Sequence, residues 1–184
     1  EDGSGETAAG LFPEINVVRP ERNLGYAGGC NYGINRANGE FVLLLNNDAT
    51  LEPGAIQAMV AETEKEQDIA AVQPKIRSMK ERQNFDYAGG AGGFLDIWGF
   101  PFARGRIFQT IEADHGQYDQ PINIFWASGT CCLLRKSALD KAGLLDETFF
   151  AHMEEIDLNW RFHLAGYRVR FTPKAVVFHH GGGT

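Results

Sequence analysis

The sharpest change from apolar to polar positions lies at residues 41–48, with the sequence FVLLLNND. Five apolar residues in a row predict a short strand that is buried on both faces, as in the interior of a parallel sheet. Two amides and a carboxylate follow, at Asn46, Asn47 and Asp48. Ligands of open α/β sheets bind at the carboxyl ends of strands, and oxygen ligands there suit a hard divalent cation. A simple Asn/Asp turn is the alternative interpretation.

The rest of the chain alternates between helical and extended patterns. Helices are predicted over residues 29–37, 53–67, 137–142 and 154–165, and strands over residues 15–18, 69–72, 124–135, 167–171 and 175–178. The strand over residues 124–135 is predicted to be interrupted at Ser128 and Gly129, Pro74 is predicted to end the strand over residues 69–72, and Pro173 separates the last two strands. The polar residues 1–10 and the glycine-rich residues 77–121 are predicted to lack regular structure. This alternation indicates one α/β domain over residues 1–184, with a mostly parallel sheet flanked by helices. Since such sheets begin with an apolar strand, a first strand and helix are expected upstream of residue 1.

Composition narrows the classes of function. The formal net charge is −7 with no basic run, which argues against nucleic acid as a partner. No apolar segment approaches the roughly 20 residues that a membrane span requires. The three cysteines, Cys30, Cys131 and Cys132, form neither a disulfide framework nor a zinc pattern. Free thiols are therefore expected.

A group of carboxylates lies in residues 149–161, with the sequence FFAHMEEIDLNWR. Glu154, Glu155 and Asp157 open a predicted helix, where the helix dipole favours negative charge, so simple capping explains them. Asp157 and Arg161 are four residues apart on this helix and are predicted to pair. The functional alternative is a general base. Two adjacent carboxylates repel, and this raises the pKa of one of them toward a useful range.

The last predicted strand ends in two histidines, within the sequence AVVFHHGGGT at residues 175–184. A single histidine is usually structural or exposed. His179 and His180, at a strand end and before a glycine loop, are better candidates for binding a metal or a phosphate.

The order and spacing of these segments carry a resemblance to a known family. NLGYAGGCNYGINRANGEFVLLLNND and SGTCCLLRKSALDKAGLLDETFFAHMEEIDLNWRFHLAGYRVRFTPKAVVFHHGGGT resemble the inverting glycosyltransferases of family 2, especially the bacterial rhamnosyltransferase-like members. The resemblance covers roughly residues 12–184. It implies the GT-A fold, a Rossmann-like fold of enzymes that use nucleotide-diphosphate sugars.

The resemblance implies a metal site. Asn46, Asn47 and Asp48 occupy the place of the family's Asp-x-Asp motif, with Asn46 in place of the first aspartate. Asp48 is expected to ligate Mg²⁺ or Mn²⁺ that bridges the donor's diphosphate, while Asn46 and Asn47 are expected to orient the donor. His179 matches a histidine that completes the metal site, and His180 is the weaker match.

The resemblance also implies a base and two binding regions. Glu155 matches the catalytic base, where aspartate is more usual, and Glu154 and Asp157 are the neighbouring candidates. A loop that approaches the donor nucleotide is expected at Asn23, Gly25 and Asn31. A pocket for the donor sugar and the acceptor is expected at Trp126, Ser128 and Gly129.

The implied reaction moves a sugar from dTDP-rhamnose or a UDP-hexose to a hydroxyl group of a cell-surface glycan or lipid-linked acceptor, with inversion. The implied location is cytoplasmic, with a peripheral contact at the inner face of the plasma membrane. Two alternatives stay open. One is a non-catalytic or truncated nucleotide-sugar-binding domain of a polysaccharide assembly protein. The other is a sugar nucleotidyltransferase, which needs a basic glycine-rich loop for the triphosphate.

Overall fold

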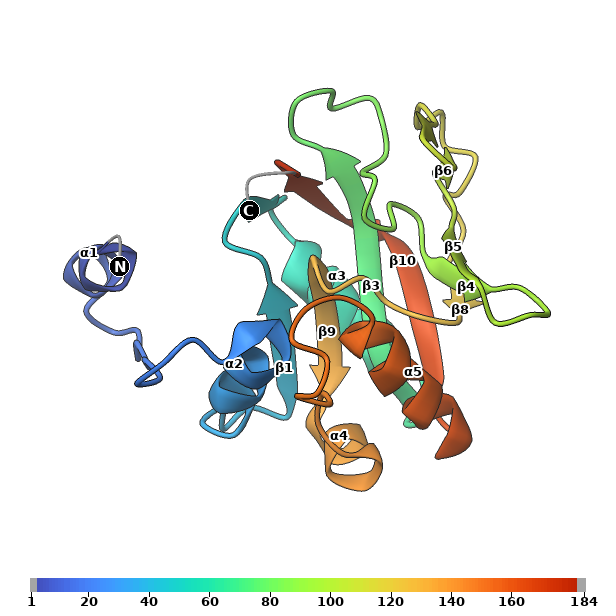
Figure 1. Ribbon diagram of the computed structural model, residues 1–184. Coiled ribbons are helices and arrows are strands. Elements are labelled where there is room, and N and C mark those ends of the chain that lie inside the picture. The colour runs from blue at the N-terminus through green and yellow to red at the C-terminus, as the bar shows by residue number, and fades with distance from the viewer. Residues whose placement is uncertain (1–2, 182–184) are drawn as a thin grey trace.

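A computed structural model describes residues 3–181 and contains a mixed central sheet with helices on both faces (Figure 1). Asp2, Gly182, Gly183 and Thr184, which belong to segments discussed above, lie outside the described residues. The strand order is β1 (Phe41–Leu45), β9 (Cys131–Arg135), β3 (Ile69–Ser78), β10 (Arg168–His179) and β2 (Ala49–Leu51), with β8 (Ile122–Ile124) also paired to β10.

The directions of the strands correct one expectation. The sheet is mixed and flanked by helices as predicted, but among the described strands only β3 and β10 pair in parallel. The physical reason is that β9 enters between β1 and β3 and runs antiparallel to both of them. The strands β1, β3 and β10 still share one direction, so their carboxyl ends meet at one edge of the sheet.

Two apolar layers hold the helices against the sheet. Side chains alternate between the two faces of a strand, and β9 illustrates this. Cys132 and Leu134 pack in the layer that contains α2 (Gly25–Ile34), α4 (Lys136–Ala142) and α5 (Glu154–Leu164). Cys131 and Leu133 pack in the opposite layer, which contains α3 (Ala55–Thr63). All three cysteines are free thiols, as predicted.

The predicted N-terminal elements are wrong. Residues Ser4–Leu11 form a helix, α1, instead of a loop, and none of its residues is buried. It lies beside the rest of the fold (Figure 1). Residues 15–18 form no strand, and their apolar side chains are exposed. An apolar run becomes a strand only where a neighbouring strand accepts its hydrogen bonds, and none of the described strands lies beside this segment.

Two prolines do not interrupt the sheet as predicted. Strand β3 continues through Pro74 to Ser78, and the two final strands are one strand, β10, which includes Pro173. The register between β3 and β10 shifts between Thr172 and Val176, opposite Pro74. A bulge tolerates a residue without a backbone N–H, so both strands continue to the edge that carries the candidate site.

The glycine-rich region contains two small hairpins. Strands β4 (Gly93–Leu95) and β5 (Pro101–Ala103) form the first hairpin, and β6 (Arg106–Ile107) and β7 (Thr110–Ile111) form the second. They project from the sheet on the side away from α1 (Figure 1). None of the helices in residues 3–181 has the length and apolar character that crossing a membrane requires.

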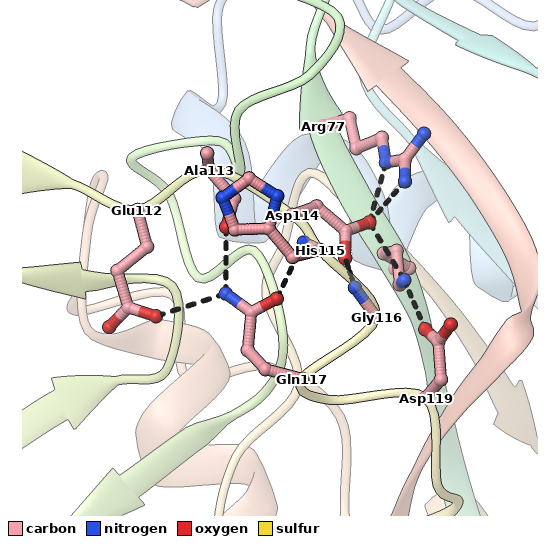
Figure 2. Close-up of polar contacts among 9 residues, drawn as sticks. Arg77, Glu112, Ala113, Asp114, His115, Gly116, Gln117 and Asp119 are labelled. Carbon is pink, nitrogen blue, oxygen red and sulfur yellow. Dashed lines mark hydrogen bonds and ion pairs between the residues drawn. The ribbon is translucent and has the colours of Figure 1, made fainter.

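An ion-pair network attaches the segment after these hairpins to β3 (Figure 2). The carboxylate of Asp114 is fully buried and accepts hydrogen bonds from Lys75 at 2.8 Å and from Arg77 Nε at 2.8 Å. Lys75 also pairs with Asp119. Burial raises the pKa of Asp114, but the bonds from Lys75 and Arg77 outweigh it and lower this pKa to about 2. Asp114 is therefore a charged structural anchor.

Candidate functional site

Asp48 and His179 come from distant parts of the sequence and lie side by side. Asp48 follows β1, and His179 is the last residue of β10. Strand β2 pairs antiparallel with β10 and sets Ala49 opposite His179. The backbone N–H of His180 donates to the carbonyl of Asp48 at 2.9 Å. As a result, Nε2 of His179 lies 3.1 Å from Oδ1 of Asp48, and the structure brings together the two residues predicted as metal ligands.

A second carboxylate, which the sequence analysis did not single out, holds the other nitrogen of His179. Nδ1 of His179 lies 3.1 Å from Oδ1 of Asp86, and Asp86 is buried. Oδ1 of Asp86 also accepts the N–H of Ala88 at 2.8 Å, and this bond fixes the position of the carboxylate. The hydrogen bond to Asp86 raises the pKa of His179, against the opposing effect of burial. No local pattern marks Asp86, because only tertiary pairing sets it beside His179.

The donor set of Asp48 and His179 fits a divalent cation in part. A carboxylate oxygen and an imidazole nitrogen are both metal ligands, and Asp86 orients the imidazole in the manner of a carboxylate–histidine–metal arrangement. Within residues 3–181, no group of three or more His, Cys, Asp or Glu side chains is arranged as a metal site. A cation held by Asp48 and His179 therefore needs further ligands from a bound molecule or water.

The end of β1 is joined to the segment before β9. The N–H of Asn46 donates to the carbonyl of Thr130 at 2.9 Å, and the carbonyl of Asn46 accepts from Ala49 at 3.2 Å. The Asn47 side chain is exposed, while those of Asn46 and Asp48 are partly buried. The turn between β1 and β2 therefore starts with its backbone fixed against Thr130.

Trp126 and Ser128, two of the three predicted pocket residues, are buried in the segment that leads into β9. Trp126 is buried against Gly93, where an added Cβ would lie 2.0 Å from the indole ring. The N–H of Ser128 donates to the buried side chain of Gln73 at 2.8 Å. The carbonyl of Gly129 accepts the hydroxyl of Tyr26 at 2.7 Å. Trp126 and Ser128 are thus buried in the protein, Gly129 connects this segment to α2, and none of the three lines either of the two cavities described below.

The predicted donor loop forms the start of α2 and packs against the segment before α5. Oδ1 of Asn23 accepts the N–H of Gly25 at 2.9 Å. Gly25 has a φ of 70°, and a Cβ there would lie 2.4 Å from the carbonyl oxygen of Phe150. The N–H of Tyr26 donates to this same carbonyl at 2.9 Å. Only glycine allows this close approach, which brings the loop beside the residues that precede Glu154.

Asn31 has a structural role in the described chain. Its Nδ2 donates to the carbonyl of Leu145 at 2.8 Å and to Glu147 at 3.0 Å, and its Oδ1 accepts the N–H of Leu145 at 3.1 Å. The side chain is buried. Asn31 therefore holds α2 against the loop before α5, and a direct contact with a donor nucleotide would require it to give up these bonds.

The three candidate carboxylates of α5 have different surroundings. Within residues 3–181, the Oε2 atoms of Glu154 and Glu155 are buried and have no hydrogen-bond partner. Burial raises the pKa of Glu155, and the charge of Glu154 adds to this. Asp157 instead accepts two bonds from Arg161, at 2.9 and 2.8 Å, as the sequence predicted for this pair. Glu155 thus has the properties of a proton acceptor, and Asp157 those of a structural ion pair.

Backbone strain lies directly before these glutamates. His152 and Met153 both have positive φ, at 72° and 73°, which residues with a Cβ rarely adopt. Each such residue costs on the order of 1–3 kcal/mol, and such strain clusters at functional sites. The helix that carries Glu154 and Glu155 therefore begins at a position that the surrounding structure enforces.

Tyr26 of α2 lies within the electrostatic influence of Glu155 and is hydrogen-bonded toward the end of β1. The negative charge of Glu155 contributes to raising the pKa of Tyr26, whose largest cause is burial. Tyr26 binds the carbonyl of Gly129, and the next residue, Thr130, binds Asn46. Hydrogen bonds thus connect Tyr26 to the end of β1, whereas Glu155 acts on Tyr26 through its charge.

Two cavities adjoin this network. One, of about 380 Å³, is lined by Asp86 and His179 together with Ser78, Glu81, Asn84, Phe85, Tyr87, Ala88, Ile111 and Gly181. The other, of about 350 Å³, lies between α2 and β1 and is lined by Tyr26, Cys30 and Asn46 among others. Glu155 lines neither of these two cavities.

Comparison with known proteins identifies similar sequences over nearly the whole chain. A family model described as "Glycosyl transferase family 2" matches residues 1–143. An N-acetylglucosaminyl-diphospho-decaprenol L-rhamnosyltransferase of Mycobacterium tuberculosis is 27% identical over 97% of this chain and 63% of its own length. A pre-mycofactocin glycosyltransferase of the same organism is 27% identical over 92% of this chain and 33% of its own length. The chain thus spans less than two thirds of the length of these relatives.

The fold is shared with a solved glycosyltransferase structure. The crystal structure of GalNAc-T7 with UDP, GalNAc and Mn²⁺ matches with a TM-score of 0.72 at 16% identity, over 97% of this chain and 35% of that one. The GT-A fold expected from the sequence is confirmed, as is the resemblance to rhamnosyltransferase-like proteins.

Proposed function

Because the chain belongs to glycosyl transferase family 2, we propose that it moves a sugar from a nucleotide-diphosphate donor to a hydroxyl group of an acceptor. The observation that carries the proposal is the contact of 3.1 Å between Asp48 and His179, two residues brought together at the sheet edge where such folds bind ligands. The donor is dTDP-rhamnose or a UDP-hexose, with dTDP-rhamnose supported by the rhamnosyltransferase relative.

In the proposed site, Asp48 and His179 hold Mg²⁺ or Mn²⁺ together with the donor's diphosphate. The Mn²⁺ and UDP in the GalNAc-T7 structure support a divalent cation here. Such a cation supplies positive charge that stabilises the leaving nucleoside diphosphate. Asp86 keeps Nδ1 of His179 occupied and Nε2 directed at Asp48, so these two residues would be the ones to hold the cation.

Glu155 is the proposed base. It takes the proton of the acceptor hydroxyl while the hydroxyl oxygen attacks the anomeric carbon and the diphosphate leaves from the opposite face, which inverts the configuration. Its raised pKa supports this role, because a base works best when its pKa approaches the working pH. Glu154 is the next candidate, and Asp157 follows because Arg161 already binds it.

Roles are also proposed for the remaining residues near Asp48 and at the start of α2. Asn46 and Asn47 orient the diphosphate beside Asp48, and the loop of Asn23 and Gly25 forms the nucleotide side of the site. The acceptor is a cell-surface glycan or a lipid-linked sugar, and the proposed location is the cytoplasm, at the inner face of the plasma membrane. The diphospho-decaprenol in the name of one relative supports a lipid-linked acceptor.

A donor-binding screen by calorimetry tests the proposal. dTDP-rhamnose, UDP-glucose, UDP-N-acetylglucosamine and the free nucleotides are titrated with Mg²⁺, Mn²⁺ or EDTA. Binding that needs the cation and is lost in Asp48→Ala is expected. Cation-independent binding, or unchanged binding by Asp48→Ala, would exclude the proposed metal site.

The non-catalytic alternative makes a different prediction for the same protein. A donor-binding domain without activity binds the nucleotide sugar but neither hydrolyses nor transfers it. Release of the nucleoside diphosphate, measured with and without acceptor sugars, separates the two functions. The unpartnered carboxylates of Glu154 and Glu155 favour the enzyme, since a binding domain has no use for a buried proton acceptor.

A further inference from the structure

The cavity of about 380 Å³ beside His179 is lined by both polar and apolar side chains. Its polar groups include the carboxylates of Glu81 and Asp86, and its apolar surface includes Ile111 and the ring of Tyr87. Ligand pockets in proteins begin at roughly 300 Å³, so this space holds one ring-sized organic molecule. Proteins fix such molecules by apolar contact together with a few well-placed polar groups, and both kinds of group are present here.

One carboxylate oxygen of Asp86 is free at this cavity. The side chain of Asp86 is only 7% exposed, and its Oδ1 is held by His179 and by the N–H of Ala88. Oδ2 has no hydrogen bond within residues 3–181. It lies toward Gly181, another lining residue, where an added Cβ would be 3.5 Å from it. A buried carboxylate oxygen without a partner is costly, so Oδ2 is an acceptor that a ligand can use.

Glu81 and Asn84 add further acceptors to the same lining. Nδ2 of Asn84 donates to Oε2 of Glu81 at 2.5 Å, while Oδ1 of Asn84 and Oε1 of Glu81 have no hydrogen bond among the described residues. The hydroxyl oxygen of Ser78 accepts the N–H of Glu81 at 3.1 Å and can still donate its own proton. Free side-chain acceptors therefore outnumber free donors, and such a set suits a ligand that carries several hydroxyl groups.

The charge of the lining narrows the class of ligand. Glu81 and Asp86 bring two negative charges, and His179 brings at most one positive charge. The lining is therefore negative overall and repels phosphates and carboxylates. Within residues 3–181, no three side chains of the metal-binding kinds are grouped to hold an ion, so the lining does not point to a second cation. A neutral molecule with several hydroxyl groups fits these charges best.

Tyr87 supplies an aromatic surface at this cavity. It is 49% exposed, although the guanidinium of Arg106 lies 4.0 Å from the centroid of its ring. Arg106 is itself fixed, because it donates to the carbonyl of Phe108 at 3.0 Å. A sugar ring has an apolar face of C–H groups and a rim of hydroxyl groups. An aromatic ring suits the first, and the free acceptors of Asp86 and Glu81 suit the second.

The segment that carries these side chains is fixed to the sheet. The N–H of Ser78 donates to the carbonyl of Asn84 at 3.0 Å, and the N–H of Asp86 donates to the carbonyl of Ile76 at 3.0 Å. The ion pairs of Asp114 attach the other end of the same region to β3 (Figure 2). A lining that is already in place loses little conformational entropy when a ligand binds.

From these observations we propose that the cavity binds a neutral sugar ring of the acceptor. Tyr87 packs against the C–H face of the ring, and Asp86 and Glu81 accept its hydroxyl groups. The inference deepens the proposed function and rests on it, because the acceptor is a glycan only if the chain transfers sugars. Glu155 does not line the cavity. The bound ring is therefore a neighbour of the ring that carries the reacting hydroxyl, and the acceptor has at least two sugar rings.

The experiment titrates the isotope-labelled chain with neutral methyl glycosides of the gluco, galacto, manno and rhamno configurations, without nucleotide or metal, and follows the amide signals by NMR. At least one glycoside should shift the signals of Tyr87, Ala88 and Ile111 in a saturable way. Tyr87→Ala should bind it roughly tenfold more weakly or worse, because the aromatic contact is lost. Tyr87→Phe keeps the ring and should bind like the original protein.

Phe12→Ala is the matched control, because Phe12 is an aromatic residue of similar exposure, 54%, at the end of α1. It should bind the glycosides like the original protein. Circular dichroism of each variant controls for folding.

The charge of the lining is tested with a pair of ligands. Methyl glucuronide differs from methyl glucoside by a carboxylate and should bind more weakly, by roughly threefold or more. Glu81→Gln keeps an acceptor for Asn84 and removes one negative charge, so it should narrow this difference. Equal or tighter binding of the glucuronide by the original protein would contradict a site for a neutral sugar.

A donor titration separates the two sources of a sugar ring. The affinity for dTDP-rhamnose with Mn²⁺ should be the same in Tyr87→Ala as in the original protein, within a factor of about two. A loss that is seen for dTDP-rhamnose and not for dTDP would assign the cavity to the donor's sugar and overturn the proposal.

Two further results would overturn it. They are the absence of saturable shifts with every glycoside of the panel, and an equal loss of binding in Phe12→Ala. Failure of glycoside binding with cation-dependent donor binding intact contradicts only the sugar site. Loss of donor binding with glycoside binding intact contradicts only the proposed function.

Discussion

Two buried carboxylates of this protein, Asp114 and Glu155, have opposite surroundings. Asp114 is enclosed by Lys75 and Arg77, and these cations lower its pKa to about 2 in spite of burial. Glu155 has a buried oxygen without a hydrogen-bond partner in the described chain, and burial beside Glu154 raises its pKa. The first group remains charged and anchors a loop, while the second is poised to exchange a proton.

The candidate metal ligands lie between these two extremes. Asp48 and Asp86 share one imidazole, so each is partnered, yet the partner is His179, which changes its charge with protonation or metal binding. Burial alone therefore does not identify a functional carboxylate. What distinguishes the three cases is the partner, which is a permanent cation, an imidazole or a second carboxylate.

The largest effect on the transfer rate is expected for Glu155→Gln. This variant tests whether the carboxylate without a hydrogen-bond partner is the base. The change keeps the shape of the side chain and removes the proton acceptor, so the transfer rate should fall by about 10²- to 10⁴-fold. Cation-dependent donor binding should survive. Steady-state kinetics and calorimetry measure the two quantities, with Glu64→Gln as a matched control on an exposed part of the chain. A near-normal rate would move the role of base to Glu154.

The next largest effect is expected for Asp48→Ala. Since it removes one of the two proposed protein ligands, affinity for Mn²⁺ in the presence of donor should fall by roughly a hundredfold or more. Electron paramagnetic resonance of free Mn²⁺ reports the affinity without any need for activity. Affinity within a factor of about two of the original value would contradict the role of Asp48.

Asp86→Asn should have a smaller effect on the same measurement. Loss of the carboxylate beside Nδ1 leaves His179 present but less well oriented, and second-layer changes of this kind cost about 10- to 100-fold in metal affinity. The asparagine retains the approximate size of the side chain, so the melting temperature should change little. An unchanged Mn²⁺ affinity in Asp86→Asn would make Asp86 purely structural.

A shift in the pH profile is expected for Glu154→Gln. The rate should be lost as pH falls through the pKa of Glu155, because the protonated base is inactive, and this pKa lies above the usual value for glutamate. Removal of the neighbouring negative charge should move the inflection to lower pH. A profile of kcat/KM against pH for both proteins measures the shift, and an inflection that does not move would show that the two glutamates are uncoupled.

The variant Asp114→Asn, which removes the charged structural anchor, is expected to have the smallest effect on catalysis. It should instead change how the stability of the fold depends on pH. The pKa of Asp114 is about 2 in the folded protein and about 3.9 in an unfolded chain. Its contribution to stability is therefore complete above pH of about 5 and is lost as pH falls toward 2. Thermal unfolding between pH 5 and 2 should show a smaller pH dependence in Asp114→Asn than in the original protein, and an identical slope would exclude the network as its source.

Local patterns predicted the residues that stand at the ends of regular elements. The apolar run before Asp48 predicted a strand, and the histidine pair predicted the end of the last strand, and both elements are present. The prediction that the first of these strands is buried on both faces is wrong, because β1 lies at the edge of the sheet and only Val42 in it is buried. The pair of Asp157 and Arg161 follows from helical spacing and is also present. These predictions succeed because each depends on residues a few positions apart.

Predictions that depended on distant neighbours were less complete. Residues 15–18 have the composition of a strand, but no described strand pairs with them. Pro74 was predicted to end a strand, but the bulge in β10 accommodates it. Asn31 was expected near the donor, and its amide instead binds the loop before α5. In each case the partner lies far along the chain.

The sequence by itself determined the chemistry available at the sheet edge, because the residue types and their order set which strand ends carry carboxylates and imidazoles. It also determined the alternation of helices and strands through hydrophobic periodicity. Only the tertiary structure decided which of these groups are partners. Pairing of β2 with β10 brought Asp48 to His179, and the turn after β3 added Asp86. The physical reason is that pKa and metal affinity depend on atoms within a few ångströms, and the fold alone sets those neighbours.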